Sequence, residues 1–190
     1  ILPRIDAVRP GDRLIGLPSS GPHSNGFSLI RRVLDDLVID LSAPAAFAPD
    51  RRLADALLEP TRLYPEAVRA AKAAGGLKAV AHITGGGFYE NLPRVLPDDA
   101  AAAIDCAAWR PQPLFRWFTQ KALARDEDML ATFNCGIGMA LVVGADEEAA
   151  MRDALIAAGW DPIALGDVTE RAEGAPAVTF QNKSQGWLRP

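Results

Sequence analysis

Apolar side chains recur along this chain at two different spacings, which predict strands and helices that alternate. A short apolar run at 12–17 predicts a buried strand, and apolar residues at helical spacing predict a helix over 27–37. The segment 41–49, rich in Ala and Pro, predicts a connection. By the same criteria we expect further strands at 77–84, 101–107, 139–143, 162–170 and 176–181, helices at 50–58, 65–75, 113–122 and 146–158, a helical turn at 88–92 and a short helix from 126.

The order of these elements predicts a mixed α/β fold. Strands that alternate with helices are typical of a mixed β-sheet flanked by helices, here arranged as three α/β/α layers. Residues 137–170 predict a strand–helix–strand unit of the ferredoxin-like kind. The chain has no internal repeat, low-complexity segment or clear internal boundary, so we expect residues 1–190 to form one domain.

Composition narrows the class of protein. Hydrophobic residues make up 49% and charged residues 23% of the 190 residues, and the net charge is −4, as in ordinary soluble globular proteins. No basic run and no long apolar run occurs, so we expect neither a nucleic-acid partner nor a membrane span. Cysteines at 106 and 135 provide no disulfide framework and no metal-ligand spacing, and a cytoplasmic location fits them best. The sequence starts without Met, so we expect a piece of a longer protein.

Residues 19–27 (SSGPHSNGF) join the first predicted strand to the first predicted helix and are rich in small polar residues. Unpaired N–H groups at a helix start, together with hydroxyl side chains, can bind an anion such as phosphate. The simpler alternative is a tight turn in which Ser24 or Asn25 caps the helix. On its own, this segment does not decide between a binding loop and a capped turn.

Two further segments combine glycines with polar side chains. Residues 82–87 (HITGGG) end a strand in three glycines, and residues 134–138 (NCGIG) lead into another strand. Consecutive glycines lose much backbone freedom on folding, so they are favoured where a ligand or another backbone comes close. Both histidines of the protein, His23 and His82, fall in these polar segments. Their coincidence predicts a shared polar site.

Several of these residues also have plainer interpretations. His82 lies in an apolar strand, and an alternative role for it is a core imidazole with hydrogen-bonded nitrogens. Cys135 is expected to be a small buried apolar residue, because no activating motif surrounds it. The aromatic residues at 114–118 are expected to be core. Glu90 follows the glycines closely enough to reach the same pocket.

Several standard nucleotide and catalytic motifs are missing from this sequence. It contains no GxxxxGK[ST] phosphate loop, no GxSxG nucleophile elbow and no residues with zinc-ligand spacing. It also lacks an acidic cluster suited to Mg²⁺, so we expect no metal site in this chain. A complete ATP site is therefore not predicted from these residues.

Four long segments carry a resemblance to a known family. The stretches GDRLIGLPSSGPHSNGFSLIRRVL, LLEPTRLY, AHITGGGFYENLPRVLP and TFNCGIGMALVV resemble the C-terminal half of the phosphoribosylformylglycinamidine cyclo-ligases, also called AIR synthetases. The tail ALGDVTERAEGAPAVTF is similar to the end of the same family. The resemblance covers residues 11–182 in the right order, which makes it far more specific than one glycine motif.

The resemblance implies an activity in de novo purine biosynthesis. Enzymes of this family use ATP and Mg²⁺ to close formylglycinamidine ribonucleotide into 5-aminoimidazole ribonucleotide. They have two α/β domains, of which the N-terminal one carries most of the ATP and Mg²⁺ residues and forms the homodimer. That half is missing from this sequence, so we expect the chain to be the C-terminal domain and to be inactive alone. Its own N-terminal domain would be its partner.

The resemblance also implies which residues face the substrate. His23 is the first candidate for acid/base chemistry or for stabilising a phosphoryl oxygen, because a neutral-to-cationic imidazole suits phosphate at physiological pH. His82 is a weaker catalytic candidate. The implied residues of the substrate and phosphate groove are Ser19, Ser20, Gly21, Ser24, Asn25, Thr84, Gly85, Gly86 and Gly87, with Glu90, Asn134 and Gly136 as weaker members.

Other functions remain open at this point. Selenophosphate synthetases, formylglycinamidine ribonucleotide synthetases, thiamine monophosphate kinases and a hydrogenase maturation factor share the two-domain architecture. The paired SGPHSNG and HITGGG segments favour the cyclo-ligase over these. Two further alternatives are a non-catalytic module that binds a phosphate-containing ligand, and a purely structural domain whose glycines serve only turns.

Overall fold

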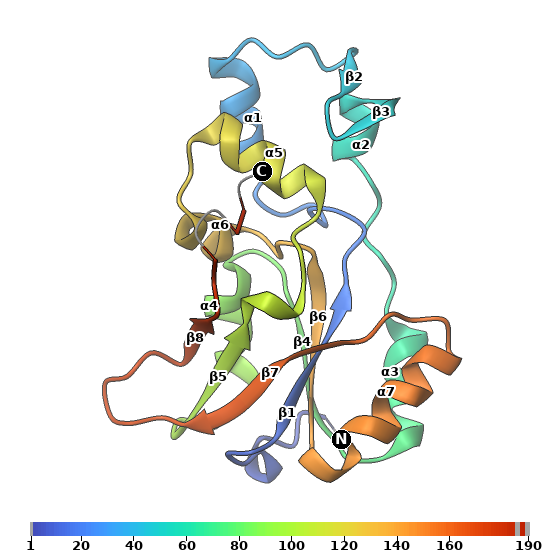
Figure 1. Cartoon of the computed structure of the whole chain (residues 1–190), viewed down its shortest axis with the longest axis vertical. Coiled ribbons are helices and arrows are strands. Elements are labelled where there is room, and N and C mark those ends of the chain that lie inside the picture. The colour runs from blue at the N-terminus through green and yellow to red at the C-terminus, as the bar shows by residue number, and fades with distance from the viewer. Residues whose placement is uncertain (1, 185–186, 189–190) are drawn as a thin grey trace.

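A six-stranded mixed β-sheet forms the centre of the protein (Figure 1). The computed structural model describes residues 2–184 and 187–188. The strands of the sheet are β1 (Arg13–Pro18), β4 (Leu77–His82), β5 (Ala100–Asp105), β6 (Ile137–Val143), β7 (Ile163–Glu170) and β8 (Val178–Gln181). They lie in the order β4-β6-β1-β7-β5-β8, and neighbours are antiparallel except β5 and β8, which run parallel. The predicted mixed sheet and its six predicted strands are confirmed.

Short helices surround the sheet. In the described part of the chain, none of them is long and apolar enough to cross a membrane. Pro65 and Pro113 stand at the first turn of their helices, where the missing N–H of proline costs nothing. The α-helices are α1 (Phe27–Asp36), α2 (Leu53–Leu57), α3 (Pro65–Ala74), α4 (Gly87–Asn91), α5 (Pro113–Ala122), α6 (Asp126–Thr132) and α7 (Glu148–Ala157).

The sheet is covered on both faces, because alternate strand residues point to opposite sides. Leu14 of β1 and Val142 of β6 belong to the larger core cluster, which includes Phe88 of α4. Their neighbours Ile15 and Val143 belong to a second cluster with the buried residues of α3 and α7. This confirms the predicted arrangement of helices on the two sides of a sheet.

Residues 137–170 form the predicted ferredoxin-like unit. β6 and β7 both pair antiparallel with β1, so they run parallel to each other with β1 between them. The helix α7 connects them and packs beside α3, at the lower right of Figure 1. Gly159 follows α7 with a φ of 80°, a left-handed conformation that glycine adopts easily at a helix end.

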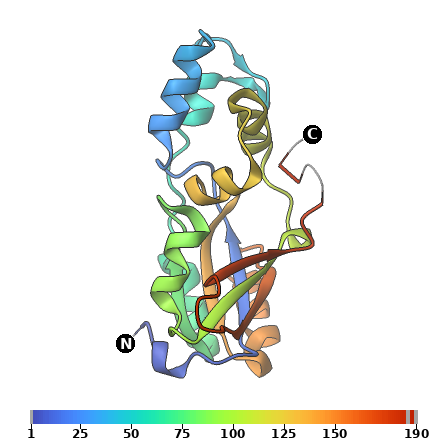
Figure 2. The same cartoon turned by 90° about the vertical axis from the view of Figure 1, so that its left-hand side faces the viewer.

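An upper group of elements stands above the sheet in Figures 1 and 2. It consists of α1, α2, α5 and the hairpin of β2 (Pro44–Ala45) and β3 (Ala48–Arg52). The predicted connection at 41–49 is therefore wrong in part, and the predicted helix over 50–58 is shorter and begins at Leu53. The residues of this hairpin do not alternate between apolar and polar, so the sequence pattern did not predict its strands.

Candidate functional site

The three polar segments predicted from the sequence meet at one edge of the sheet. β6 pairs antiparallel with both β1 and β4, so the ends of β1 and β4 lie beside the beginning of β6. Residues 19–26 leave β1 and residues 83–87 leave β4 at this edge, and residues 134–136 lead into β6 there. The edge faces the upper group in Figure 1. Strand topology thus brings together segments that are more than forty residues apart.

Close contacts join the three segments directly. Asn25 Oδ1 lies 3.8 Å from the position that a Cβ atom on Gly85 would occupy. Gly26 packs against the ring of Phe133, so tightly that any side chain at this position would overlap the ring. The residues that the sequence placed in one site are therefore neighbours.

The buried side chain of Asn134 holds the loop of residues 19–26 in place. Its side chain is fully buried, its Nδ2 donates to the carbonyl of Gly21 (2.9 Å), and its Oδ1 accepts from Ser19 Oγ (3.1 Å) and from the N–H of Gly136 (2.9 Å). Ser19 is held further by Gln112, whose Nε2 donates to its carbonyl (2.6 Å). Ser19 and Asn134 thus lie inside the wall of the site, where they position the loop.

A second buried asparagine holds the glycine loop in the same way. Asn91 is 5% exposed, and its Nδ2 donates to the carbonyls of Gly87 (2.7 Å), Gly85 (3.2 Å) and Thr84 (3.3 Å). Its Oδ1 accepts from the hydroxyl of Thr84 (3.2 Å). Each of the two loops is therefore held by one buried side-chain amide, which supplies the hydrogen bonds that several backbone groups would otherwise form with water.

His23 is a buried hydrogen-bond acceptor. Its Nε2 accepts from the N–H groups of Ser20 (3.0 Å) and Arg62 (3.3 Å), while the hydroxyl of Ser20 lies 3.0 Å away and donates to the carbonyl of Pro60 (2.7 Å). These donors place the ring hydrogen of the neutral imidazole on Nδ1. Nδ1 is buried, and no described residue accepts its hydrogen bond.

The charge state of His23 differs from the one suggested by its sequence context. Burial, and then the nearby charges of His82 and Arg62, lower the pKa of His23 to about 4. The imidazole is therefore neutral at physiological pH, and the cationic form that would pair with phosphate is not populated. Its catalytic role stays a prediction, whereas its contacts are those of a positioning residue.

His82 is exposed, so its interpretation as a core imidazole is wrong. It is the last residue of β4, and the buried residues Ala79 and Ala81 just before it point to the opposite face. Its ring centroid lies 6.1 Å from that of His23 and 5.8 Å from that of Tyr64. Partial burial lowers the pKa of His82 as well. The two histidines are thus neighbours at the site, as predicted.

The start of α1 has no side-chain cap, which corrects the prediction for Ser24 and Asn25. The N-cap residue is Gly26, and the side chain of Asn25 donates instead to the carbonyl of His23. His23 and Ser24 both have left-handed φ angles, 54° and 59°, which are uncommon for residues other than glycine. Such strain is often kept at functional loops. The first N–H groups of α1 therefore lie next to a strained polar loop.

The three consecutive glycines differ in whether the fold could accept a side chain at their positions. Gly86 and Gly87 have φ angles of 86° and 57°, and a Cβ atom would overlap Glu90 at the first position and the Leu130 carbonyl at the second. Gly85 has neither restriction, since the nearest atom to its added Cβ is 3.8 Å away. The fold thus requires glycine at positions 86 and 87 but not at 85.

The remaining candidates lie at the border of the site. Glu90 is exposed and forms an ion pair with Arg94 (3.7 Å) beside Gly86. Cys135 is fully buried, which confirms its predicted structural role, and burial raises the pKa of its thiol. Among the described residues, no three His, Cys, Asp or Glu side chains are grouped so that they could hold a metal ion.

The comparison with protein families decides which family this fold represents. Residues 9–178 match the model of the "AIR synthase related protein, C-terminal domain". The chain belongs to the AIR synthase-related family. The resemblance inferred from its four long segments is confirmed at this level, and the site described above lies entirely within the matched residues.

Solved structures of other proteins share the fold of this AIR synthase-related domain. Thiamine-monophosphate kinase from Stenotrophomonas maltophilia matches with a TM-score of 0.60 and 16% identity, over 91% of this chain and 51% of the kinase chain. HypE from E. coli, a hydrogenase maturation protein, matches with a TM-score of 0.56 and 16% identity, over 92% of this chain and 47% of that one. The AIR synthase-related domain spans about half the length of these proteins.

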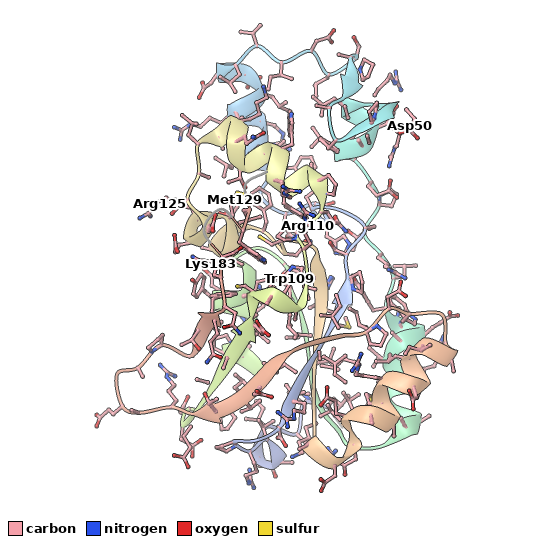
Figure 3. The ribbon with its side chains drawn as sticks, viewed as in Figure 1. Asp50, Trp109, Arg110, Arg125, Met129 and Lys183 are labelled. Carbon is pink, nitrogen blue, oxygen red and sulfur yellow. The ribbon has the colours of Figure 1, made fainter. Side chains whose placement is uncertain are left out.

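Sequence reasoning missed several residues of the site in this AIR synthase-related domain. Gln112 and Asn91 position the two loops, and Arg62 contacts His23 through its backbone. Trp109 donates its Nε1–H to the carbonyl of Cys135 (3.1 Å) and, with Arg110, lies where the sheet meets the upper group (Figure 3). Arg62 and Asn91 stand in segments that carried the family resemblance, which was the one signal that could have found them.

Lowering the pH from 7 to about 4.5 is expected to reduce the free energy of unfolding by about 2 kcal/mol through His23. The pKa of His23 is about 4 in the folded protein, against 6.5 for an ordinary histidine. The unfolded chain therefore binds the proton first. This stabilisation is complete above pH 6.5 and is lost as the pH falls toward 4. Urea unfolding across this range and an NMR titration of the His23 ring test it, and titration near 6.5 would contradict it.

Proposed function

We propose that this AIR synthase-related domain is the C-terminal half of a phosphoribosylformylglycinamidine cyclo-ligase. The single observation that carries the proposal is the convergence of the SGPHSNG, HITGGG and NCGIG segments at one edge of the sheet. The complete enzyme would close formylglycinamidine ribonucleotide into 5-aminoimidazole ribonucleotide in the cytoplasm, as a homodimer formed by its N-terminal half.

In the proposed reaction ATP activates a carbonyl oxygen. The γ-phosphoryl group of ATP passes to the formyl oxygen of the substrate, and ADP leaves. The substrate's own amine then attacks the formyl carbon, and phosphate departs with the former formyl oxygen as the imidazole ring forms. Both steps require a site that binds phosphate groups and holds the amine near the carbon that it attacks.

The exposed surface of the site fits phosphate recognition by neutral donors. The uncapped N–H groups at the start of α1 lie next to Ser24 and Asn25, and a helix N-terminus of this kind favours an anion. Gly85 lies opposite Asn25, and the absence of a side chain there leaves room for a ligand to approach the backbone. The half-buried hydroxyls of Ser20 and Thr84 border this surface but already donate to the carbonyl of Pro60 and to Asn91 Oδ1, so the donors that are left for an anion are backbone N–H groups.

ATP and Mg²⁺ fit this half of the protein poorly. The described residues of the chain provide no group of carboxylates for the metal ion, so we assign no step through Mg²⁺ or ATP to them. We propose instead that the missing half holds both. A HypE structure with 18% identity and a TM-score of 0.59 contains ATP, which supports ATP use by proteins of this fold.

Combining the chain with a separately expressed N-terminal half of a cyclo-ligase tests the proposal. We expect no ATP-dependent ring closure with the chain alone, and measurable turnover when the two halves are mixed. Formation of 5-aminoimidazole ribonucleotide and release of ADP are the quantities to measure. If the folded halves associate and bind a phosphate-containing ligand without turnover, the alternative of a non-catalytic module is favoured. Turnover of thiamine monophosphate or selenide instead would favour another enzyme of this architecture.

A further inference from the structure

The substrate of the proposed reaction carries a phosphomonoester on its ribose. Such a group has nearly two negative charges at neutral pH and is recognised best by a guanidinium that donates two parallel hydrogen bonds. The residues assigned to the site above are short of positive charge. Both histidines have lowered pKa values, and Glu90, the charged residue among the rest, is an anion.

Arg62 brings a cation to this edge of the sheet. It lies in the segment between α2 and α3, and its backbone N–H donates to His23 Nε2. Its charge contributes to the lowered pKa of His23, which places the guanidinium within electrostatic range of the imidazole. The residue is half-buried, so its charge is screened less than that of a fully exposed arginine.

An aromatic ring orients this guanidinium. The Cζ atom of Arg62 lies 4.1 Å from the centroid of the Trp160 ring, and Trp160 stacks on Tyr64 with 5.3 Å between centroids. Tyr64 is fixed in turn by its hydroxyl, which donates to the carbonyl of Pro18 (2.9 Å) at the end of β1. Stacking on the ring face leaves the edge of the guanidinium, where its N–H donors lie, free to bind an oxyanion.

The donors of Arg62 are unused within the described part of the chain. Its guanidinium forms no hydrogen bond and no ion pair with any residue that the structure describes there. Arg51 and Arg52, close to it in the sequence, are instead paired with Glu59 (2.8 Å) and Asp55 (2.7 Å). An oriented, half-buried arginine without a carboxylate partner is typical of an anion-binding position.

We infer that Arg62 binds the sugar phosphate of the substrate at the edge of the site formed by His23 and Trp160. This inference rests on the proposed function for the identity of the substrate. It adds a specificity residue that neither the glycine loop nor the polar loop contains. Because the imidazole of His23 is held by the backbone of Arg62, replacing the arginine side chain leaves that hydrogen bond intact.

Ribose 5-phosphate and ribose are the probes for this inference. Calorimetric titration of the chain, alone and combined with its N-terminal half, is expected to detect ribose 5-phosphate binding and much weaker ribose binding. Arg62→Met keeps the apolar stem on Trp160 but removes the charge, and it should weaken ribose 5-phosphate binding by about tenfold or more. Arg62→Lys should recover part of the loss. Arg69→Met removes an exposed arginine of α3 and should change nothing.

The outcomes separate this inference from the proposed function. Ribose 5-phosphate binding that depends on Arg62, without ring closure, would support the phosphate site and reject the cyclo-ligase. If the combined halves close the ring and Arg62→Met binds ribose 5-phosphate as tightly as the unmodified chain, the role of Arg62 is rejected while the proposed function stands. The inference would also be overturned if Arg62→Met lost only ATP binding, or if neither the chain nor the combined halves bound ribose 5-phosphate at millimolar concentrations. Circular dichroism shows whether each variant is folded.

Discussion

Asn134→Ala is expected to lower the free energy of unfolding by about 3–5 kcal/mol. The substitution removes the amide that joins the loop after β1 to the segment that leads into β6, and it leaves the hydroxyl of Ser19, the N–H of Gly136 and the carbonyl of Gly21 without partners in a buried place. Each such group costs about 1–3 kcal/mol when it is unsatisfied, and only part of this cost is relieved by water that enters. Urea unfolding at neutral pH measures the change.

A matched control is available on the surface. Gln120→Ala removes an exposed side-chain amide from α5 and should change the unfolding free energy by less than about 0.5 kcal/mol. The combined halves carrying Asn134→Ala should also lose turnover, because the loop with His23 loses its anchor. A loss of stability below about 1 kcal/mol would contradict the role that we give to this buried amide.

Gly85→Ala is expected to reduce turnover of the combined halves by about a hundredfold while the chain remains folded. The fold has room for a methyl group at this position, since the nearest atom is Asn25 Oδ1 at 3.8 Å. The methyl group would instead occupy the space in which we propose that a ligand approaches the backbone. Turnover and the thermal unfolding midpoint, measured on the same preparation, distinguish a lost site from a lost fold.

The neighbouring glycine provides the contrast for this experiment. Gly87→Ala would place a Cβ atom on the carbonyl of Leu130 at a φ of 57°, so we expect this variant to be strongly destabilised. A folded Gly85→Ala with full turnover would remove the main support for ligand approach at the glycine loop. An unfolded Gly85→Ala would show that Gly85, like Gly86 and Gly87, is required by the fold.

The sequence was sufficient to predict the sheet, because each of the six strands is marked by local apolar pattern and by breakers at its ends. A strand was predicted at 101–107 in spite of its alanines and lies at Ala100–Asp105, where burial explains why small side chains suffice. The hairpin at 44–52 was missed, since its residues are mostly exposed and show no alternation. Local pattern reports burial, so elements outside the core leave little trace in it.

The sequence by itself also indicated which segments meet at the candidate site and to which family the domain belongs. Only the tertiary structure decided what each residue does there. It made His23 a neutral acceptor, exposed His82 and gave Asn134 and Asn91 their positioning roles. It also brought Arg62 to the edge of the site over Trp160, nearly a hundred residues away. Burial, charge state and partner choice depend on contacts between segments that are distant in the chain, and no local pattern encodes them.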